Sequence, residues 1–152
     1  MDFMHDMLAD GRTVRVFTLI DAYTRECLAL VAAPHFRGAD VALVLSAVVA
    51  ERGTPSIIQC DQGTEFTSMA VDQWAYWNNL QLDFSRRGRP GDNAVCDAFN
   101  GSVRRECLSQ AYFLTLDDLR ATLATWKDDY NNARPHSSLN NLAPAHFRAT
   151  AS

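Results

Sequence analysis

The chain has 152 residues, 47% of them hydrophobic, which is enough for one folded domain with a buried core. Its formal net charge of -4 excludes the uniformly basic surface that many nucleic-acid-binding domains present. The longest apolar run, residues 41–50, is too short to span a bilayer, and no secretion signal is visible. The composition therefore favours a cytoplasmic protein with no membrane partner.

Hydrophobic periodicity and turn residues divide the chain into strands and helices. The segment Thr13–Ile20 is strand-like because it is rich in β-branched and aromatic residues. Valines and leucines recur every three to four residues after Gly38, which indicates a buried helix that stops at Gly53. In chain order, the expected elements are strands over residues 2–8, 13–20 and 26–33, a helix over 38–52, a strand over 56–60, a helix over 65–80, an edge strand over 81–85, and helices over 92–109 and 115–130. This order predicts an α/β domain with a mixed β-sheet flanked by helices.

Four cysteines are present, and no two of them form a C-x-x-C pair; they are Cys27, Cys60, Cys96 and Cys107. Zinc sites and redox motifs usually show such pairs. Without a secretion signal, disulfide bonds are not expected either. We therefore expect four buried, reduced thiols.

The charge is distributed unevenly along the chain. Between Ser85 and Arg105, five arginines stand against two aspartates, which gives a local net charge of +3. A basic strip of this kind can hold a phosphate backbone although the whole chain is acidic. The alternative is a solvated charged face without a ligand, and composition alone leaves both interpretations open.

Two aspartates lie where an α/β fold presents functional groups. Asp61 directly follows a predicted buried strand, and Gly63 allows a sharp turn after it. Acids at the carboxyl ends of buried strands point into the crevice where open α/β sheets bind ligands, although an aspartate here can equally serve as a turn residue. Asp97 lies in a predicted helix beside the basic strip, and 35 residues separate it from Asp61.

Five segments of the chain carry recognisable motifs. They are DF at residues 2–3, LIDAYTRECLAL from Leu19, CDQGTEF from Cys60, GDNAVCDAFNGSVRRECL from Gly91 and YNNARPHSSLNNLAP from Tyr130. In this order they resemble the catalytic core of bacterial insertion-sequence transposases of the retroviral-integrase type, and they cover nearly the whole chain. The resemblance implies one integrase core domain over residues 1–152, with a ribonuclease-H-like fold and a family tail at about residues 130–148.

The resemblance also implies a chemistry. The family binds two Mg²⁺ or Mn²⁺ ions with an Asp, Asp, Glu triad, and by position the acids in this chain are Asp2, Asp61 and Asp97. Carboxylate oxygens suit such hard cations, and two ions ~3.5–4 Å apart can activate an attacking oxygen and stabilise a leaving one. The implied reaction is cleavage of DNA at an element end and its transfer to a target, by a homo-oligomer assembled on the DNA.

Further residues receive roles from the same resemblance. The residues expected to contact DNA are Arg86, Arg87, Arg89 and Arg104. Arg104 lies seven residues after Asp97, which returns it to nearly the same helix face. Glu65 and Asn93 are expected to orient the metal ligands, and helix capping is the alternative for Asn93.

Packing is the expected role of two other groups of residues. The tail residues Tyr130, Asn131, Arg134 and His136 carry the last motif, and we expect them mainly to pack against the domain. Trp74 and Trp77 are expected in the core.

The third acid departs from the family pattern, because Asp97 stands where the family has glutamate. The shorter side chain retracts the carboxylate by about 1.5 Å, and a misplacement of about 1 Å can cost on the order of 10²-fold in rate. Glu106 cannot substitute for it, because nine helical steps place Glu106 on the opposite face. Asp92 lies before the helix and is a poor substitute.

Two further departures concern the N-terminus. Asp2 is the second residue, so the domain is expected to be truncated at its N-terminus and Asp2 to lie near a frayed end. Asp6, Asp10 and Asp21 are the alternative first acids. The family pattern also places a helix-turn-helix segment before the core, and the printed sequence starts within the core.

Three interpretations of function follow. The leading one is a transposase catalytic core whose metal-dependent activity is weakened or lost. The main alternative is a non-catalytic remnant that binds DNA or associates with full-length transposase. The third is a general ribonuclease-H-like nuclease, which the basic strip and the tail motif disfavour.

Overall fold

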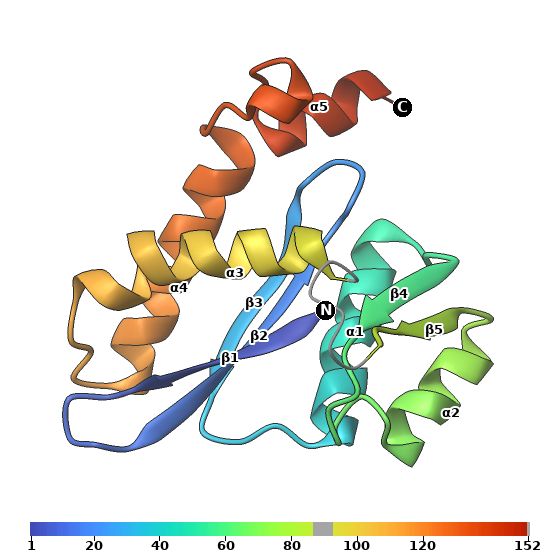
Figure 1. Ribbon diagram of the computed structural model, residues 1–152, viewed down its shortest axis with the longest axis horizontal. Helices are drawn as coiled ribbons and strands as arrows, with labels where there is room; N and C mark the ends of the chain where they lie inside the picture. The colour runs from blue at the N-terminus through green and yellow to red at the C-terminus, as the bar shows by residue number, and fades with distance from the viewer. Residues whose placement is uncertain (87–92, 152) are drawn as a thin grey trace.

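The computed structural model describes residues 1–86 and 93–151 (Figure 1). The strands are β1 (Asp2–Met7), β2 (Thr13–Ile20), β3 (Cys27–Ala33), β4 (Ile57–Cys60) and β5 (Gln81–Phe84). The helices are α1 (Gly38–Arg52), α2 (Met69–Trp77), α3 (Ala94–Glu106), α4 (Leu116–Asn132) and α5 (Pro144–Ala151), with short 3₁₀ turns η1 (Leu108–Gln110) and η2 (Ser137–Leu139). Within these residues no helix has the length and apolar character that a membrane crossing requires.

The strands form an antiparallel sheet in the order β1–β2–β3 and a parallel pair, β4–β5. Asp2 at the start of β1 lies opposite Thr18 of β2. The two sheets meet at the N-terminus, where the α-ammonium of Met1 donates to the carbonyl of Gln59 at 2.6 Å. The predicted combination of antiparallel and parallel strands is confirmed, and the beginning of β1 lies at their junction.

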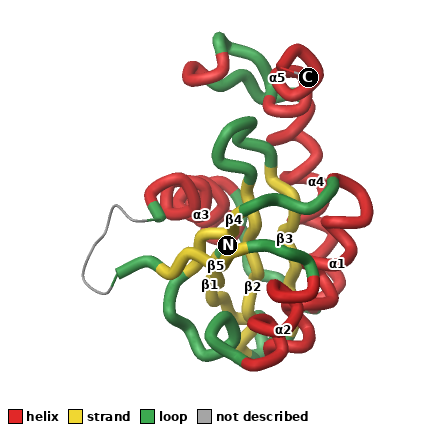
Figure 2. Tube along the Cα trace, turned by 90° about the vertical axis from the view of Figure 1, so that its right-hand side faces the viewer, coloured by secondary structure: helices red, strands yellow, loops and turns green. Residues whose placement is uncertain are grey.

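Side chains alternate across β2 and so build one core on each face of the sheet. Val14 and Val16 belong to a core that includes Phe99 of α3 and extends to α4. Phe17 and Leu19 belong to a second core, which includes residues of α1, α2 and β4. Figure 2 shows α3 on one side of the strands and α1 on the other. Helix α3, which carries the third acid, is therefore packed directly on the sheet whose strand β1 carries the first acid.

Helix α2 is shorter than predicted, because the residues before it form a turn. The carbonyl of Gly63 accepts the N–H groups of both Phe66 and Thr67 at 3.0 Å, which closes the chain on itself. The Ser68 hydroxyl then caps the helix by accepting the N–H of Val71 at 3.3 Å. Residues 65–68 therefore belong to the loop that follows β4.

The expected burial of two tryptophans is half right. Trp74 packs against the second core, and its indole N–H donates to the Ser46 hydroxyl at 2.8 Å. Trp77 is 78% exposed, so the prediction that it lies in the core is wrong. The reason is that Val71 and Ala75 form the buried face of α2, and Trp77, two residues after Ala75, lies on nearly the opposite face of the helix.

The tail packs as expected. Helix α4 begins at the predicted cap, where the Thr115 hydroxyl accepts the N–H of Asp118 at 3.1 Å. At its other end, Asn131 is buried and bonds both backbone groups of Cys27, at 2.8 and 2.9 Å. Tyr130 is buried as well, with its ring 4.8 Å from that of His136. The motif therefore fastens α4 to β3.

All four cysteines are buried and free, which confirms the expectation of reduced thiols. Burial raises the pKa of Cys27 to about 12 and that of Cys60 to about 11. Both thiols are therefore protonated at neutral pH and poor metal ligands or nucleophiles.

Candidate active site

The first predicted acid, Asp2, opens β1 and is partly buried beside α3. The backbone N–H of Phe3 donates to its Oδ1 at 2.8 Å, and the side-chain amide of Asn100 donates to its Oδ2 at 3.0 Å. Burial raises the pKa of the Asp2 carboxyl, the Phe3 N–H lowers it, and the negative charges of Asp61 and Asp97 raise it further. Asp61 and Asp97 therefore both lie close enough to Asp2 for their charges to act on it.

The N-terminal residue anchors this site, so the prediction that Asp2 lies at a frayed end is wrong. Met1 is only 4% exposed, and its side chain packs in the second core with Phe17 and Ile58. Its positive charge also opposes the rise in the pKa of Asp2. Apolar burial and the bond to β4 together fix the start of β1.

The second acid, Asp61, is the first residue beyond β4. Its Oδ1 accepts the N–H of Gly63 at 2.9 Å. A Cβ on Gly63 would lie 3.0 Å from that oxygen, while the φ of Gly63 is outside the left-handed region. A Cβ here would therefore press against the Asp61 carboxylate, so glycine favours this close approach and does not serve an unusual backbone conformation. Strand β4 is only half-buried, since Ile58 and Cys60 are buried and Ile57 and Gln59 are exposed, so the predicted buried strand is half right. Asp61 is both a turn residue and an acid at the end of this strand, so the two interpretations are compatible.

The third acid, Asp97, lies in the first turn of α3, and its N–H donates to the carbonyl of Asn93 at 3.0 Å. The unpaired N–H groups of a helix N-terminus favour negative charge at this place. Asn93 occupies the N-cap position, but its side chain makes no capping hydrogen bond. The capping alternative for the Asn93 side chain is therefore wrong, and its expected role toward Asp97 stays a prediction.

One face of α3 runs along β1 and carries Asp97, Asn100 and Arg104, because residues at i, i+3 and i+7 share a helix face. Asn100 contacts Asp2, and the Arg104 guanidinium donates to the carbonyl of His5 at 2.7 Å. The predicted alignment of Arg104 with Asp97 is consistent with these contacts. Asn100 was not predicted from the sequence, although its position one turn after Asp97 was an available signal.

The carboxylates fit a divalent cation incompletely. Within residues 1–86 and 93–151, no three His, Cys, Asp or Glu side chains form a group that could hold a metal ion. The charge of Asp61 raises the pKa of Asp2 more than that of Asp97 does. Proteins usually bind Mg²⁺ with one or two carboxylates plus substrate phosphates. Asp2 and Asp61 are therefore the candidate ligands of one such ion, and the described residues contain no three-carboxylate group that Asp97 would complete.

Three of the other acids considered from the sequence have structural partners. Asp10 pairs with Arg12 at 2.7 Å, and Asp21 accepts two backbone N–H groups in the turn between β2 and β3 at 2.8 and 3.0 Å. Glu106 bonds Arg134 at 2.7 Å, in agreement with the expectation that it points away from the acids. None of these three carboxylates is among the charges that shift the pKa of Asp2.

Part of the predicted basic strip lies outside the described residues, namely Arg87, Arg89 and the acid Asp92. Arg86 follows β5 and borders a cavity of about 300 Å³ together with Gln59 and Asp83. Nothing in the geometry tests the expected contact of these arginines with DNA.

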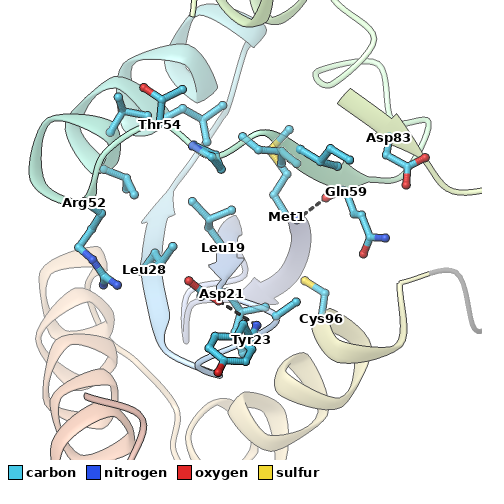
Figure 3. A pocket seen from close by; sticks show the side chains of 18 of the residues that line it. Met1, Leu19, Asp21, Tyr23, Leu28, Arg52, Thr54, Gln59, Asp83 and Cys96 are labelled. Atoms are coloured by element: carbon cyan, nitrogen blue, oxygen red, sulfur yellow. Dashed lines mark hydrogen bonds between the residues drawn. The ribbon is translucent and has the colours of Figure 1, made fainter. Parts of the chain in front are cut away.

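A second cavity, of about 550 Å³, lies beside the predicted site, but none of Asp2, Asp61 and Asp97 lines it. Leu19, Leu28 and Leu45 contribute apolar wall from β2, β3 and α1. Met1 and Cys96, which directly precede Asp2 and Asp97, border it from the other side (Figure 3). The cavity therefore borders the backbone that positions two of the three acids.

Glu65 lies in the loop that follows Asp61 and forms an ion pair with Arg15 of β2. Burial raises the pKa of the Glu65 carboxyl, but the hydrogen bond and charge of Arg15, together with the hydrogen bonds from the Glu65 backbone N–H and the Thr64 hydroxyl, lower it by more, so the pKa is lowered. Glu65 is thus ionised and paired at neutral pH. Nothing in the sequence pointed to Arg15.

The sequence matches two family models described as integrase core domain, over residues 1–90 and 78–144. The "Insertion element IS407 uncharacterized 31.7 kDa protein" of Burkholderia multivorans is 44% identical over 98% of this chain and 54% of that protein. The "Insertion element IS476 uncharacterized 39.2 kDa protein" of Xanthomonas euvesicatoria is 36% identical over 98% of this chain and 43% of that protein. The chain thus spans about half the length of the curated relatives it matches.

Solved structures of retroviral integrases have the same fold. A chain of the simian T-cell lymphotropic virus intasome superimposes with a TM-score of 0.81 at 14% identity, covering 96% of this chain and 51% of that one. The HTLV-2 integrase catalytic core domain, solved in complex with magnesium, gives a TM-score of 0.73 at 9% identity, covering 96% of this chain and 94% of that one. The predicted ribonuclease-H-like fold is confirmed.

Proposed function

This chain belongs to the integrase core domain family, and from that premise we propose that it is the catalytic core of an insertion-sequence transposase. The proposed reaction is metal-dependent cleavage of DNA and transfer of the cut end to a target. The observation that supports the proposal is that Asp61, after β4, and Asp97, in the first turn of α3, both lie near enough to Asp2 of β1 for their charges to contribute to its raised pKa. Carboxylates that repel one another in a partly buried site are typical of functional sites, because a bound cation relieves the repulsion.

Asp2 and Asp61 are the proposed ligands of one divalent cation. When bound, Mg²⁺ or Mn²⁺ would activate an attacking oxygen and stabilise the charge on a leaving one. The Asn100 amide and the Phe3 N–H orient the Asp2 carboxylate, and the Gly63 N–H orients that of Asp61. These hydrogen bonds fix the two ligands before any substrate arrives.

Asp97 is the proposed ligand of a second cation, and we propose that it binds this cation weakly. It reaches about 1.5 Å less far than the glutamate of the family pattern. We therefore propose that the chain cleaves and joins DNA more slowly than a family member with glutamate at this position.

DNA is the proposed partner, held along the basic strip. The local net charge of +3 between Ser85 and Arg105 supports this placement, as does the exposure of Arg104 on the face of α3 that carries Asp97. Arg86, Arg87, Arg89 and Arg104 are the proposed phosphate contacts. We further propose that copies of the chain assemble on DNA and that the reaction takes place in the cytoplasm.

A non-catalytic transposase remnant is the second candidate. It is favoured by one observation, the lack of a three-carboxylate group among the described residues. Such a protein would keep the fold and the basic strip, and would bind DNA or full-length transposase without cutting.

Nicking of a supercoiled DNA plasmid tests the proposal. The native chain and Asp61→Ala are compared with Mn²⁺, with Mg²⁺ and with a chelator, after circular dichroism has shown that both are folded. Cutting by the native chain alone, and only with metal, is the expected result. Equal cutting by both proteins would refute the role of Asp61. DNA binding without any cutting would favour the remnant, and preferential cutting of an RNA–DNA hybrid would favour a general nuclease.

A further inference from the structure

We propose that Arg15 is a positioning residue, which acts through Glu65 to hold the loop that carries Asp61 against the strand that carries Asp2. The inference rests on the proposed function, because it assigns a role toward the cation that Asp2 and Asp61 would share. Arg15 and Glu65 are 50 positions apart, and neither is a proposed ligand.

Arg15 makes two contacts that support the same role. Its guanidinium donates to Glu65 in the loop after β4. Its Cζ also lies 4.0 Å from the centre of the Phe3 ring, and Phe3 is the residue after Asp2. The Arg15 side chain therefore links Phe3, which follows Asp2 directly, to Glu65, which lies four positions after Asp61.

A second contact between loop and strand reinforces the first. Phe66, the residue after Glu65, stacks on Phe3 with ring centroids 5.1 Å apart, and Phe66 is fully buried. Loop and strand are thus joined twice, by the ion pair of Arg15 with Glu65 and by the stacked rings.

The loop transmits this anchoring to Asp61 because it is closed by its own hydrogen bonds. The Gly63 N–H binds the Asp61 carboxylate, and the Gly63 carbonyl accepts the N–H of Phe66 at 3.0 Å. A Cβ on Gly63 would lie 3.5 Å from the Glu65 carboxylate, so Gly63 is packed between the two acids. Movement of Glu65 away from β2 would carry Asp61 with it.

The ion pair is well suited to hold this geometry. The side chains of Arg15 and Glu65 are 22% and 16% exposed, so solvent screens their attraction only in part. Lysine could not replace Arg15, because only a planar guanidinium both covers an aromatic ring and bonds a carboxylate in a fixed direction.

Positioning matters here because Mg²⁺ requires ligands at ~2.0–2.1 Å in near-octahedral geometry. Changes in residues that orient metal ligands typically cost about 10- to 100-fold in metal affinity. The Arg15–Glu65 pair is therefore expected to set the spacing between Asp2 and Asp61, on which the affinity for the cation depends.

Two measurements on the full chain test the proposal, with Glu65→Gln and Arg15→Lys as variants. The matched control is Glu106→Gln, which breaks another partly exposed Arg–Glu pair, with Arg134, outside the proposed site. Hydrogen exchange of residues 61–67 reports the loop itself, without any metal. Mn²⁺ affinity, measured by electron paramagnetic resonance, reports the consequence, and Asp61→Ala identifies binding at the proposed ligands.

In Glu65→Gln and Arg15→Lys, we expect the backbone amides of residues 61–67 to exchange hydrogen faster than in the native chain. We expect both variants to bind Mn²⁺ about 10-fold more weakly. Glu106→Gln should change neither quantity. Unchanged hydrogen exchange of residues 61–67 in Glu65→Gln would overturn the proposal, whatever the measured Mn²⁺ affinity. Faster exchange with unchanged Mn²⁺ affinity would show that the Arg15–Glu65 pair stabilises the loop without positioning the metal ligands, and would overturn the proposal. If the native chain and Asp61→Ala bind Mn²⁺ equally, the proposed function fails, and the positioning role with it, even if the loop is held as described.

Discussion

The side-chain amide of Asn100, in α3, donates to the carboxylate of Asp2, at the start of β1, across 98 positions of sequence. This bond joins the helix that carries Asp97 to the strand that carries the first acid. The Asn100 carbonyl oxygen is buried and has no hydrogen-bond partner in the described part of the chain. Asn100 thus gives one hydrogen bond to the site and leaves one acceptor unsatisfied.

Asn100→Ala should weaken Mn²⁺ binding by about 10-fold, because Asp2 loses the donor that orients it. Stability should change by only about 1 kcal/mol, since the variant loses one hydrogen bond and removes one unsatisfied atom. Titration calorimetry and urea unfolding measure the two effects. Ser102→Ala, on the same helix, is the control and should leave the affinity unchanged. A loss of stability without a loss of affinity would mean that Asn100 only packs α3 on β1.

Asp97→Glu should increase metal-dependent nicking on the order of 10²-fold, because the added methylene moves the carboxylate about 1.5 Å toward the other acids. Initial rates of plasmid nicking with Mn²⁺ measure this. Asp97→Ala provides the lower limit, and the native chain is expected to lie between the two variants. Equal rates for the native chain and Asp97→Glu would show that the length of this side chain does not limit the reaction.

Asp2→Asn should raise the melting temperature at pH 7 and low salt. Folding raises the pKa of Asp2, so the folded state favours its protonated form. The resulting stabilisation is fully present below the ordinary value of 3.8 and is lost as pH rises through the folded-state pKa. The ionised carboxylate therefore destabilises the fold at pH 7, and asparagine removes that effect. Circular dichroism melts at pH 7 and near pH 3.5 should show the advantage shrinking in acid.

The opposite sign is expected at Asp10, which provides the control for the pH experiment. The backbone N–H and the guanidinium of Arg12 lower the pKa of Asp10. Asp10→Asn should therefore not raise the melting temperature at pH 7. A rise for both variants would indicate a general effect of negative charge on this acidic chain, and not repulsion within the site.

Asn131→Ala should destabilise the chain by about 2–3 kcal/mol, because it leaves the backbone N–H and carbonyl of Cys27 buried and unpaired. Denaturant unfolding measures the change. Asn132 is a neighbouring asparagine whose side chain bonds only Asp128, on the exposed side of α4. Asn132→Ala should cost about 0.5 kcal/mol or less. Similar losses for both variants would contradict the role of Asn131 in fastening α4 to β3.

The sequence by itself determined the order of the elements, and it predicted which acids form the site. Strand β2 and helix α1 were found because their apolar periodicity is local, and Thr115 was found because a helix cap is read within four residues. Asp61 and Asp97 were predicted because they lie in contiguous motifs at a fixed spacing, and their role as metal ligands stays a prediction.

Only the tertiary structure decided how the acids are supported. Asn100 and Arg15 act on residues 98 and 50 positions away, across elements whose relative register no local pattern encodes. The same holds for Met1, which is buried because β2, β4 and α1 enclose it, although a chain end is expected to fray. Local periodicity fixes which faces are apolar, but the contacts between side chains at this site follow from how those faces pack against one another.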